Sequence, residues 1–121
     1  MNTPVIVAIF LGSGLLFAVL AVPMILGRVR PNPFYGLRTR ATFADRRVWY
    51  RANMKSGRDL LLLGLSISTL AVLLPSAPGM TPVVHASVMV GVTLIGVLSF
   101  AAIGIARANR FLRDYRQSED V

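Results

Sequence analysis

Three long runs without a charged residue constrain the fold of this chain more than any other feature. The first covers residues 5–26, the second lies between Asp59 and His85, and the third covers residues 86–106. At about 1.5 Å per residue, the first run would make roughly 33 Å of helix, which is enough to cross the hydrocarbon core of a bilayer. The sequence therefore predicts an all-α integral membrane protein with three transmembrane helices.

Two alternatives to this interpretation are disfavoured. A cleaved signal peptide needs a basic segment before a short apolar core, but residues 1–26 contain neither Lys nor Arg and the apolar run is long. A soluble helical bundle is the alternative for the whole chain. However, 55% of the 121 residues are hydrophobic and only 15% are charged, and buried helices of soluble proteins seldom offer such long runs. We interpret all three runs as spans.

The second run is too short for a span unless its helix begins earlier. Four residues break it before the third run: Pro75, Pro78, Gly79 and Pro82. Residues 60–74 alone would reach only about 22 Å. We therefore expect the helix to begin near residues 55–58, whose long side chains can reach the head groups. The predicted spans are about 5–26, 57–75 and 84–106, in a single domain covering residues 1–121.

The basic residues predict the orientation of these spans. All 13 Lys and Arg lie either between residues 27 and 59 or after residue 106. Because Lys and Arg are enriched on the cytoplasmic side of membrane proteins, the linker 27–56 and the tail 107–121 are expected to be cytoplasmic. The N-terminus is then outside. Twelve of the 13 are Arg, which favours a bacterial source, so we predict a multi-pass protein of the bacterial plasma membrane.

The linker predicts an extended segment followed by a helix. Pro31 and Pro33 each disfavour helix at the residue before them. Thr42 is predicted as the N-cap of a helix that begins at Phe43, with Asp45 three residues on in a capping box. This helix has no clean hydrophobic face, so we expect a cytoplasmic interfacial helix that lies at the head groups and bends into the second span.

Four basic side chains are expected to contact lipid head groups from this helix. Three recur at every fourth residue and share one ridge, and the fourth lies beside them: Arg47, Arg51, Lys55 and Arg58. Basic residues next to the cytoplasmic leaflet are attracted to anionic lipids. Anionic lipids are therefore predicted partners, whereas nucleic acid is not expected because the basic residues lie close to the membrane.

Eleven other linker positions carry residue types that topology does not demand: Pro31, Asn32, Tyr35, Gly36, Arg38, Thr39, Thr42, Asp45, Trp49, Asn53 and Gly57. We predict them as a partner-binding or structural motif. The stretch PNPFYGLRTRATFADRRVWYRANMKSG, residues 31–57, resembles the signature of the SdpI family of bacterial membrane proteins. The resemblance implies a role like that of the best-known member, which protects its producer against a secreted toxic peptide and signals by holding a transcriptional repressor at the membrane.

The chain offers little for catalysis. It has no cysteine and a single histidine, His85, which is expected at the outer end of the third span and far from the acidic residues. No charged side chain inside a span is available as an acid, a base or a proton relay. We expect no enzymatic activity, no cofactor and no metal. His85 is interpreted as an interfacial residue, with a metal or proton-sensing role as the alternative.

A protein of this kind is expected to work by contact. Small residues four apart allow helices in lipid to approach closely, and three such pairs are present: Gly14/Ala18, Gly64/Ser68 and Ser87/Gly91. They suit packing within one chain as well as docking of other integral membrane proteins. The short, uncharged outer stretch 75–84 favours an accessory or regulatory subunit of a larger plasma-membrane assembly, such as a lipid or solute transporter. The alternative is an SdpI-like immunity protein, whose partners would be an extracellular peptide and a cytoplasmic regulator.

Overall fold

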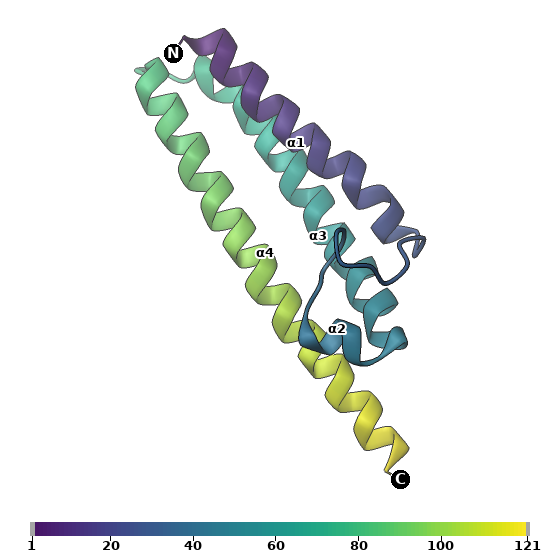
Figure 1. Ribbon diagram of the computed structural model, residues 1–121. Helices are drawn as coiled ribbons and strands as arrows, with labels where there is room; N and C mark the ends of the chain where they lie inside the picture. Colours follow the sequence, from purple (N-terminus) through teal and green to yellow (C-terminus); the bar gives the residue numbers. More distant parts are fainter. Residues whose placement is uncertain (1, 121) are drawn as a thin grey trace.

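The structure is a computed structural model that describes residues 2–120, and it is built from helices (Figure 1). They are α1 (Thr3–Ile25), α2 (Arg40–Ala44), α3 (Arg46–Leu73), the 3-10 turn η1 (Leu74–Ser76) and α4 (Pro82–Glu119). No strand occurs between residues 2 and 120. Three helical stretches are long and apolar enough to cross a membrane: α1, α3 continued by η1, and α4. The predicted all-α architecture with three transmembrane helices is confirmed.

Helices α1 and α3 touch backbone to backbone where two of the small-residue pairs meet. A methyl group added to Gly14 would lie 2.5 Å from the carbonyl oxygen of Gly64 and 2.9 Å from the amide nitrogen of Ser68. One added to Gly64 would lie 2.9 Å from the amide nitrogen of Ala18. These two pairs therefore serve packing within the chain. The third pair differs, since a methyl group on Gly91 would meet no atom within 4 Å.

The helix caps of the linker differ from the prediction. Thr39, not Thr42, is the N-cap of α2: its hydroxyl accepts from the Thr42 amide at 3.2 Å, and the Thr42 hydroxyl accepts from the Thr39 amide at 2.8 Å. Asp45 has an extended backbone, which separates α2 from α3, and its carboxylate caps α3 by accepting from the Arg47 amide at 2.8 Å. The prediction of Thr42 as N-cap and Asp45 as its capping-box partner was wrong, because α2 begins three residues earlier than expected and Asp45 caps α3 instead.

The helix before the second span is not a separate interfacial helix. Residues 46–73 form one continuous helix of 28 residues, about 42 Å long. Gly57, where we expected that helix to give way to the span, is instead a point of close contact. A methyl group there would lie 2.9 Å from the amide nitrogen of Ile25 at the end of α1. Within residues 2–120, the only additional linker helix is α2, which has five residues.

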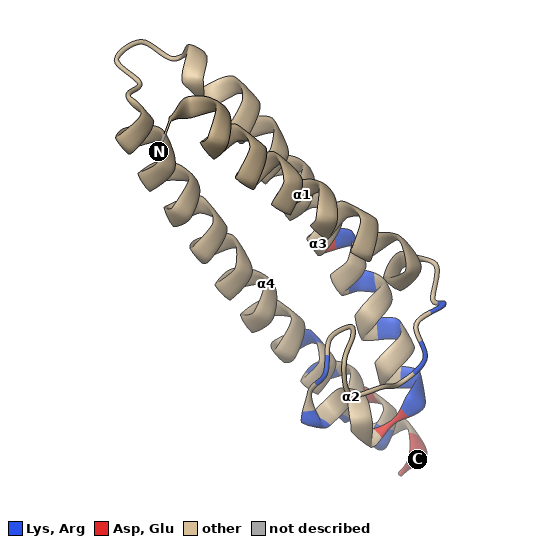
Figure 2. Cartoon of the chain, turned by 45° about the horizontal axis from the view of Figure 1, so that its top comes forward, with Lys and Arg blue, Asp and Glu red and all other residues tan. Residues whose placement is uncertain are grey.

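Helix α4 is also longer than its span. It has 38 residues and continues beyond residue 106 to Glu119, so its last part extends past the other helices (Figure 1). All Lys and Arg, together with all described Asp and Glu, lie toward one end of the bundle: in the segment between α1 and α3, which includes α2, in the first half of α3 and from residue 107 of α4 onward (Figure 2). We call this the basic end and the opposite one the charge-free end.

Candidate functional site: a folded linker at the basic end

Asn32 organises the turn that follows α1. Its side-chain oxygen accepts hydrogen bonds from the amides of Phe34 at 2.8 Å and Tyr35 at 2.7 Å, and its amide nitrogen donates to the Arg30 carbonyl at 2.7 Å. An asparagine side chain that forms hydrogen bonds with backbone groups two or three residues away makes an Asx-turn, which mimics a turn of the backbone. The Tyr35 hydroxyl donates to the Leu20 carbonyl, which ties the turn to α1. Burial raises the pKa of Tyr35.

Asn53 holds the middle of the linker from α3. Its side chain is 2% exposed; the oxygen accepts from the Leu37 amide at 2.6 Å and the nitrogen donates to the Trp49 carbonyl at 2.9 Å. Gly36 passes directly over it with a φ of +97°, and a methyl group there would lie 2.7 Å from the Asn53 oxygen. Only glycine adopts this positive φ without strain and, because it has no Cβ, leaves room for the Asn53 oxygen.

Trp49 fixes the first part of the linker. Its ring is fully buried, and its indole N–H donates to the Val29 carbonyl at 2.8 Å. A buried indole needs such an acceptor to avoid an unsatisfied donor. Trp49 and Asn53, one turn apart on α3, thus bind successive stretches of linker backbone. The linker is a folded element rather than a flexible connection.

The structure divides the eleven motif residues by exposure. Thr42, Trp49 and Asn53 are buried, and Gly57 packs against the end of α1. The side chains of Pro31 and Arg38 are exposed, although the Arg38 guanidinium also donates to the Pro33 carbonyl. Most of the motif therefore holds the linker together, and its exposed members are the ones that a partner could reach. Whether they bind one stays a prediction.

Two of the four predicted head-group residues contact other parts of the protein. Arg47 donates to Asp45 at 2.7 Å and also contacts Glu119, and its guanidinium lies 4.5 Å from the ring centroid of Tyr115. Arg51 lies 4.0 Å above the ring of Phe111. Cation–π and ionic contacts thus join the start of α3 to the end of α4.

The charges of this contact also stabilise one another. The hydrogen bond from Arg47 holds the pKa of Asp45 below its usual value, and the bonds to Asp45 and Glu119 raise the pKa of Arg47. Lys55 and Arg58, the other two predicted head-group residues, are exposed. For these two, lipid contact stays a prediction.

The tail of α4 also belongs to the site, although the prediction from the sequence did not include it. A buried cluster joins the linker and the start of α3 to this tail: Leu37, Ala41, Val48, Ala52, Ala108 and Phe111. Leu112 and Tyr115 pack against it. The signal was present in the sequence, because positions 108, 111, 112 and 115 have the i, i+3, i+4, i+7 spacing of an amphipathic helix. Nearer the spans, Arg107 donates to Asp59 at 2.8 Å and links α4 to α3.

An open hollow of about 350 Å³ lies on the surface of the linker, lined by Arg30, Pro31, Thr42, Phe43 and Arg46. Arg30 and Arg46 are exposed, and neither forms an ion pair with an acidic side chain within residues 2–120. The hollow therefore offers two guanidinium groups to an anionic group. No group of three or more His, Asp or Glu side chains in the described part of the chain could hold a metal ion.

The sequence model of the SdpI/YfhL protein family matches residues 28–106, which include nearly all of the linker, all of α3 and residues 82–106 of α4. No curated protein and no solved structure matches the chain. The matched region covers more than half of the 121 residues. This multi-pass membrane protein therefore belongs to the SdpI/YfhL family.

Proposed function

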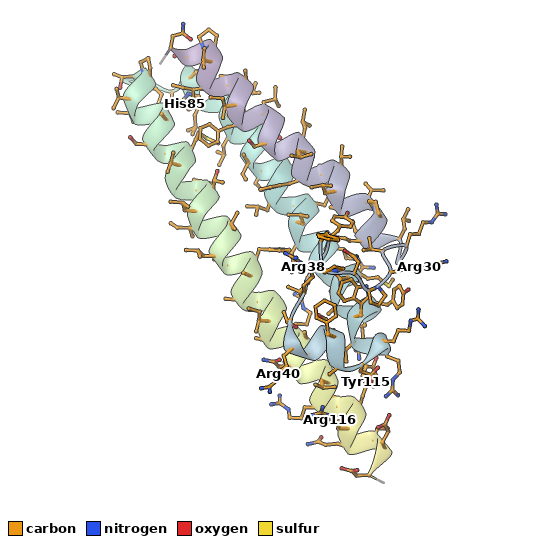
Figure 3. The ribbon with its side chains drawn as sticks, in the orientation of Figure 1. Arg30, Arg38, Arg40, His85, Tyr115 and Arg116 are labelled. Carbon is orange, nitrogen blue, oxygen red and sulfur yellow. The ribbon has the colours of Figure 1, made fainter. Side chains whose placement is uncertain are left out.

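We propose that this chain is a non-enzymatic protein of the bacterial plasma membrane that acts by contact, with its N-terminus outside and its basic end in the cytoplasm. The one-sided distribution of Lys and Arg supports this orientation (Figure 2). The single histidine lies at the charge-free end, away from every described Asp and Glu (Figures 2 and 3), so residues 2–120 hold no pair of a histidine with a carboxylate.

The orientation has a direct test, since the chain contains no native cysteine. Asn2→Cys and Ser76→Cys should react with a membrane-impermeant thiol reagent added to intact cells, whereas Ser118→Cys should react only after the cells are opened. Labelling of Ser118→Cys from outside would overturn the orientation.

The proposed contact surface is the outside of the folded linker. Arg30, Arg38, Arg40 and Arg46 are exposed, and none of the four pairs with an acidic side chain of the described chain. Figure 3 shows Arg30 and Arg40 directed away from the helices. Because Asn32, Trp49 and Asn53 fix the linker backbone beneath them, the backbone positions that carry these guanidinium groups are held in a defined arrangement. Such a surface is complementary to an acidic segment of a protein partner.

Membership of the SdpI/YfhL family is the main observation that supports our proposal for the function. It favours SdpI-type immunity and signalling, in which the chain protects its producer against a secreted toxic peptide and passes the signal to a cytoplasmic regulator bound at the linker. The test is a strain that lacks this gene, grown in cell-free medium from a dense culture of the parent strain. Immunity predicts that the mutant stops growing while the parent continues.

Complementation sharpens this experiment. The wild-type gene should restore growth fully, Arg113→Ala should match it, and Arg38→Ala should restore growth but fail to retain the cytoplasmic regulator. Arg38 is an exposed, charged residue of the motif, and Arg113 is an exposed arginine of the tail outside the motif. Normal growth of the deletion strain in the conditioned medium would contradict the immunity role.

A subunit role in a larger membrane assembly is the second candidate, and the charge-free end favours it. Residues 77–81, between η1 and α4, contain no charged side chain, so an extracellular peptide would find little polar surface there. In this case an integral membrane protein should co-purify with the chain in constant ratio after extraction in a gentle detergent. Absence of such a protein, together with growth arrest of the deletion strain, would exclude this candidate.

A further inference from the structure

The turn that follows α1 bends back toward the membrane-spanning part of the molecule before the chain reaches α2 (Figure 1). The Tyr35 hydroxyl donates to the carbonyl of Leu20, which lies five residues before the end of α1 at Ile25. Five residues of helix correspond to about 7.5 Å. The turn therefore does not simply leave the bundle where α1 ends, because part of it lies alongside the spans.

A small hollow of about 170 Å³ places the turn at the same depth. It is lined by residues of the turn and of all three spans, among them Tyr35, Gly36, Leu20, Leu60 and Phe100. The stretches that supply the last three of these residues, 3–25 and 60–106, contain no charged side chain. The turn thus packs against the parts of the spans whose composition suits the hydrocarbon of a bilayer.

Phe34, next to Tyr35 in this turn, directs an aromatic ring away from the bundle. At 88%, it is the most exposed large hydrophobic side chain of residues 2–120. An aromatic ring at this depth, beside charge-free helices, is surrounded by lipid in a membrane and not by water. Aromatic side chains are enriched where the hydrocarbon meets the head groups. The position of Phe34 therefore fits an anchor in lipid.

The backbone of the turn is also suited to lipid, where polar groups must find partners within the protein. Pro31 and Pro33 have no N–H group. The N–H groups of Phe34 and Tyr35 both donate to the side-chain oxygen of Asn32, whose nitrogen donates back to the Tyr35 carbonyl at 3.2 Å. Four of the five residues 31–35 therefore present no free N–H group, which lowers the cost of placing an irregular segment among acyl chains.

We propose that residues 31–36 form a re-entrant turn, which inserts the Phe34 ring among the acyl chains of the leaflet next to the basic end. Arg38 limits the depth: its guanidinium donates to the Pro33 carbonyl, and its long side chain keeps the charge at the head groups. The turn thus reaches only the outer part of the hydrocarbon. Because the proposal concerns depth at the basic end, it holds for either orientation of the chain.

The test compares Phe34 with Phe43, the other exposed phenylalanine of the linker. Phe43 is 54% exposed and lines the hollow that also contains Arg30 and Arg46, so we expect it in water. Nitroxide labels are placed in liposomes on Phe34→Cys, Phe43→Cys and, as a lipid-facing reference, Leu98→Cys, whose native side chain is 68% exposed. Their collisions are measured with oxygen, which concentrates in hydrocarbon, and with a neutral water-soluble nickel chelate. The Phe34 label should favour oxygen, as the Leu98 label does, and the Phe43 label should favour nickel.

A second measurement uses the same cysteines without the nitroxide. In membranes opened to both sides, a water-soluble maleimide should modify Phe34→Cys at least about tenfold more slowly than Phe43→Cys, because apolar surroundings suppress the reactive thiolate. After unfolding in SDS the two rates should be equal, which assigns the difference to the folded protein in its membrane. Equal oxygen and nickel preferences of the two linker labels, or equal maleimide rates in membranes, would overturn the proposal.

Discussion

Asn53 makes the hydrogen bonds on which the middle of the linker depends. It satisfies the Leu37 amide, the Trp49 carbonyl and its own buried polar atoms. Asn53→Ala should therefore lower the free energy of unfolding by about 1–3 kcal/mol, since the buried Leu37 amide loses its acceptor. Asn109→Ala, on an exposed surface of α4, is the matched control and should change it by less than about 0.5 kcal/mol. Denaturant unfolding in detergent, followed by helix content, measures both. Equal losses would contradict the buried position of Asn53.

Asp45 should give the linker a dependence on pH. Because its folded-state pKa is lowered by Arg47, its contribution is present above its ordinary pKa of about 3.9 and is lost as pH falls through the lower folded value. Asp45→Ala should cost about 1 kcal/mol of unfolding free energy at pH 7 through the lost cap, and the difference from wild type should shrink at pH 2. Asp45→Asn, which can still cap but cannot pair with Arg47, should lose less at pH 7. Thermal unfolding at both pH values measures this; a difference that persists at pH 2 would contradict it.

At the residue scale, the sequence indicated which linker residues matter but not what each one contacts. Asn53 and Trp49 stood out because topology does not require them, yet their bonds reach backbone groups 16 and 20 positions away in the chain. Residue spacing does not reveal such partners. The cap of α2 was misassigned for a related reason. Thr39 and Thr42 are equally good capping residues, and only the path of the backbone decides between them.

At the element scale, the crossing of α1 and α3 depends on glycine at one face of α1. Gly14→Val should push the helices apart, because its Cβ would meet the Gly64 carbonyl at 2.5 Å; overpacking of this kind costs about 1–3 kcal/mol. Gly12→Val is the control on the same helix, since a Cβ there meets no atom within 4 Å. Unfolding of both variants in the same detergent checks the contrast. A Gly12→Val loss as large as that of Gly14→Val would contradict the crossing.

Element boundaries were only partly predictable. Hydropathy located the three spans because lack of charge over about 20 residues is a direct consequence of the bilayer's thickness. It did not show that α3 begins at Arg46 and α4 ends at Glu119, because outside the bilayer a helix can continue through charged residues. The apolar stripe of Ala108, Phe111, Leu112 and Tyr115 carried that information, but the positive charges around it were interpreted only as a signal of orientation.

At the scale of the whole molecule, the linker and the tail form one unit at the basic end. The cluster of Leu37, Ala41, Ala108 and Phe111, together with the contacts of Arg47 and Arg51 to the tail, makes a small folded layer next to the membrane. The sequence indicates that the tail has an apolar face, but not that this face packs on a linker some 70 residues earlier in the chain. This association changes the interpretation of the basic residues, some of which hold this layer together and do not serve only as membrane anchors.

The most direct test of this account is oxidative cross-linking of Ala41→Cys with Ala108→Cys in isolated membranes. Both residues are buried in the cluster that joins α2 to α4, and the chain has no native cysteine, so a folded linker docked on the tail predicts rapid formation of an intramolecular disulfide. The control pair is Ala41→Cys with Ala102→Cys, which lies on the same helix about 9 Å nearer the charge-free end and is exposed; it should remain largely reduced. Equal, slow cross-linking of both pairs would show that the linker is a mobile basic connection and would contradict the account.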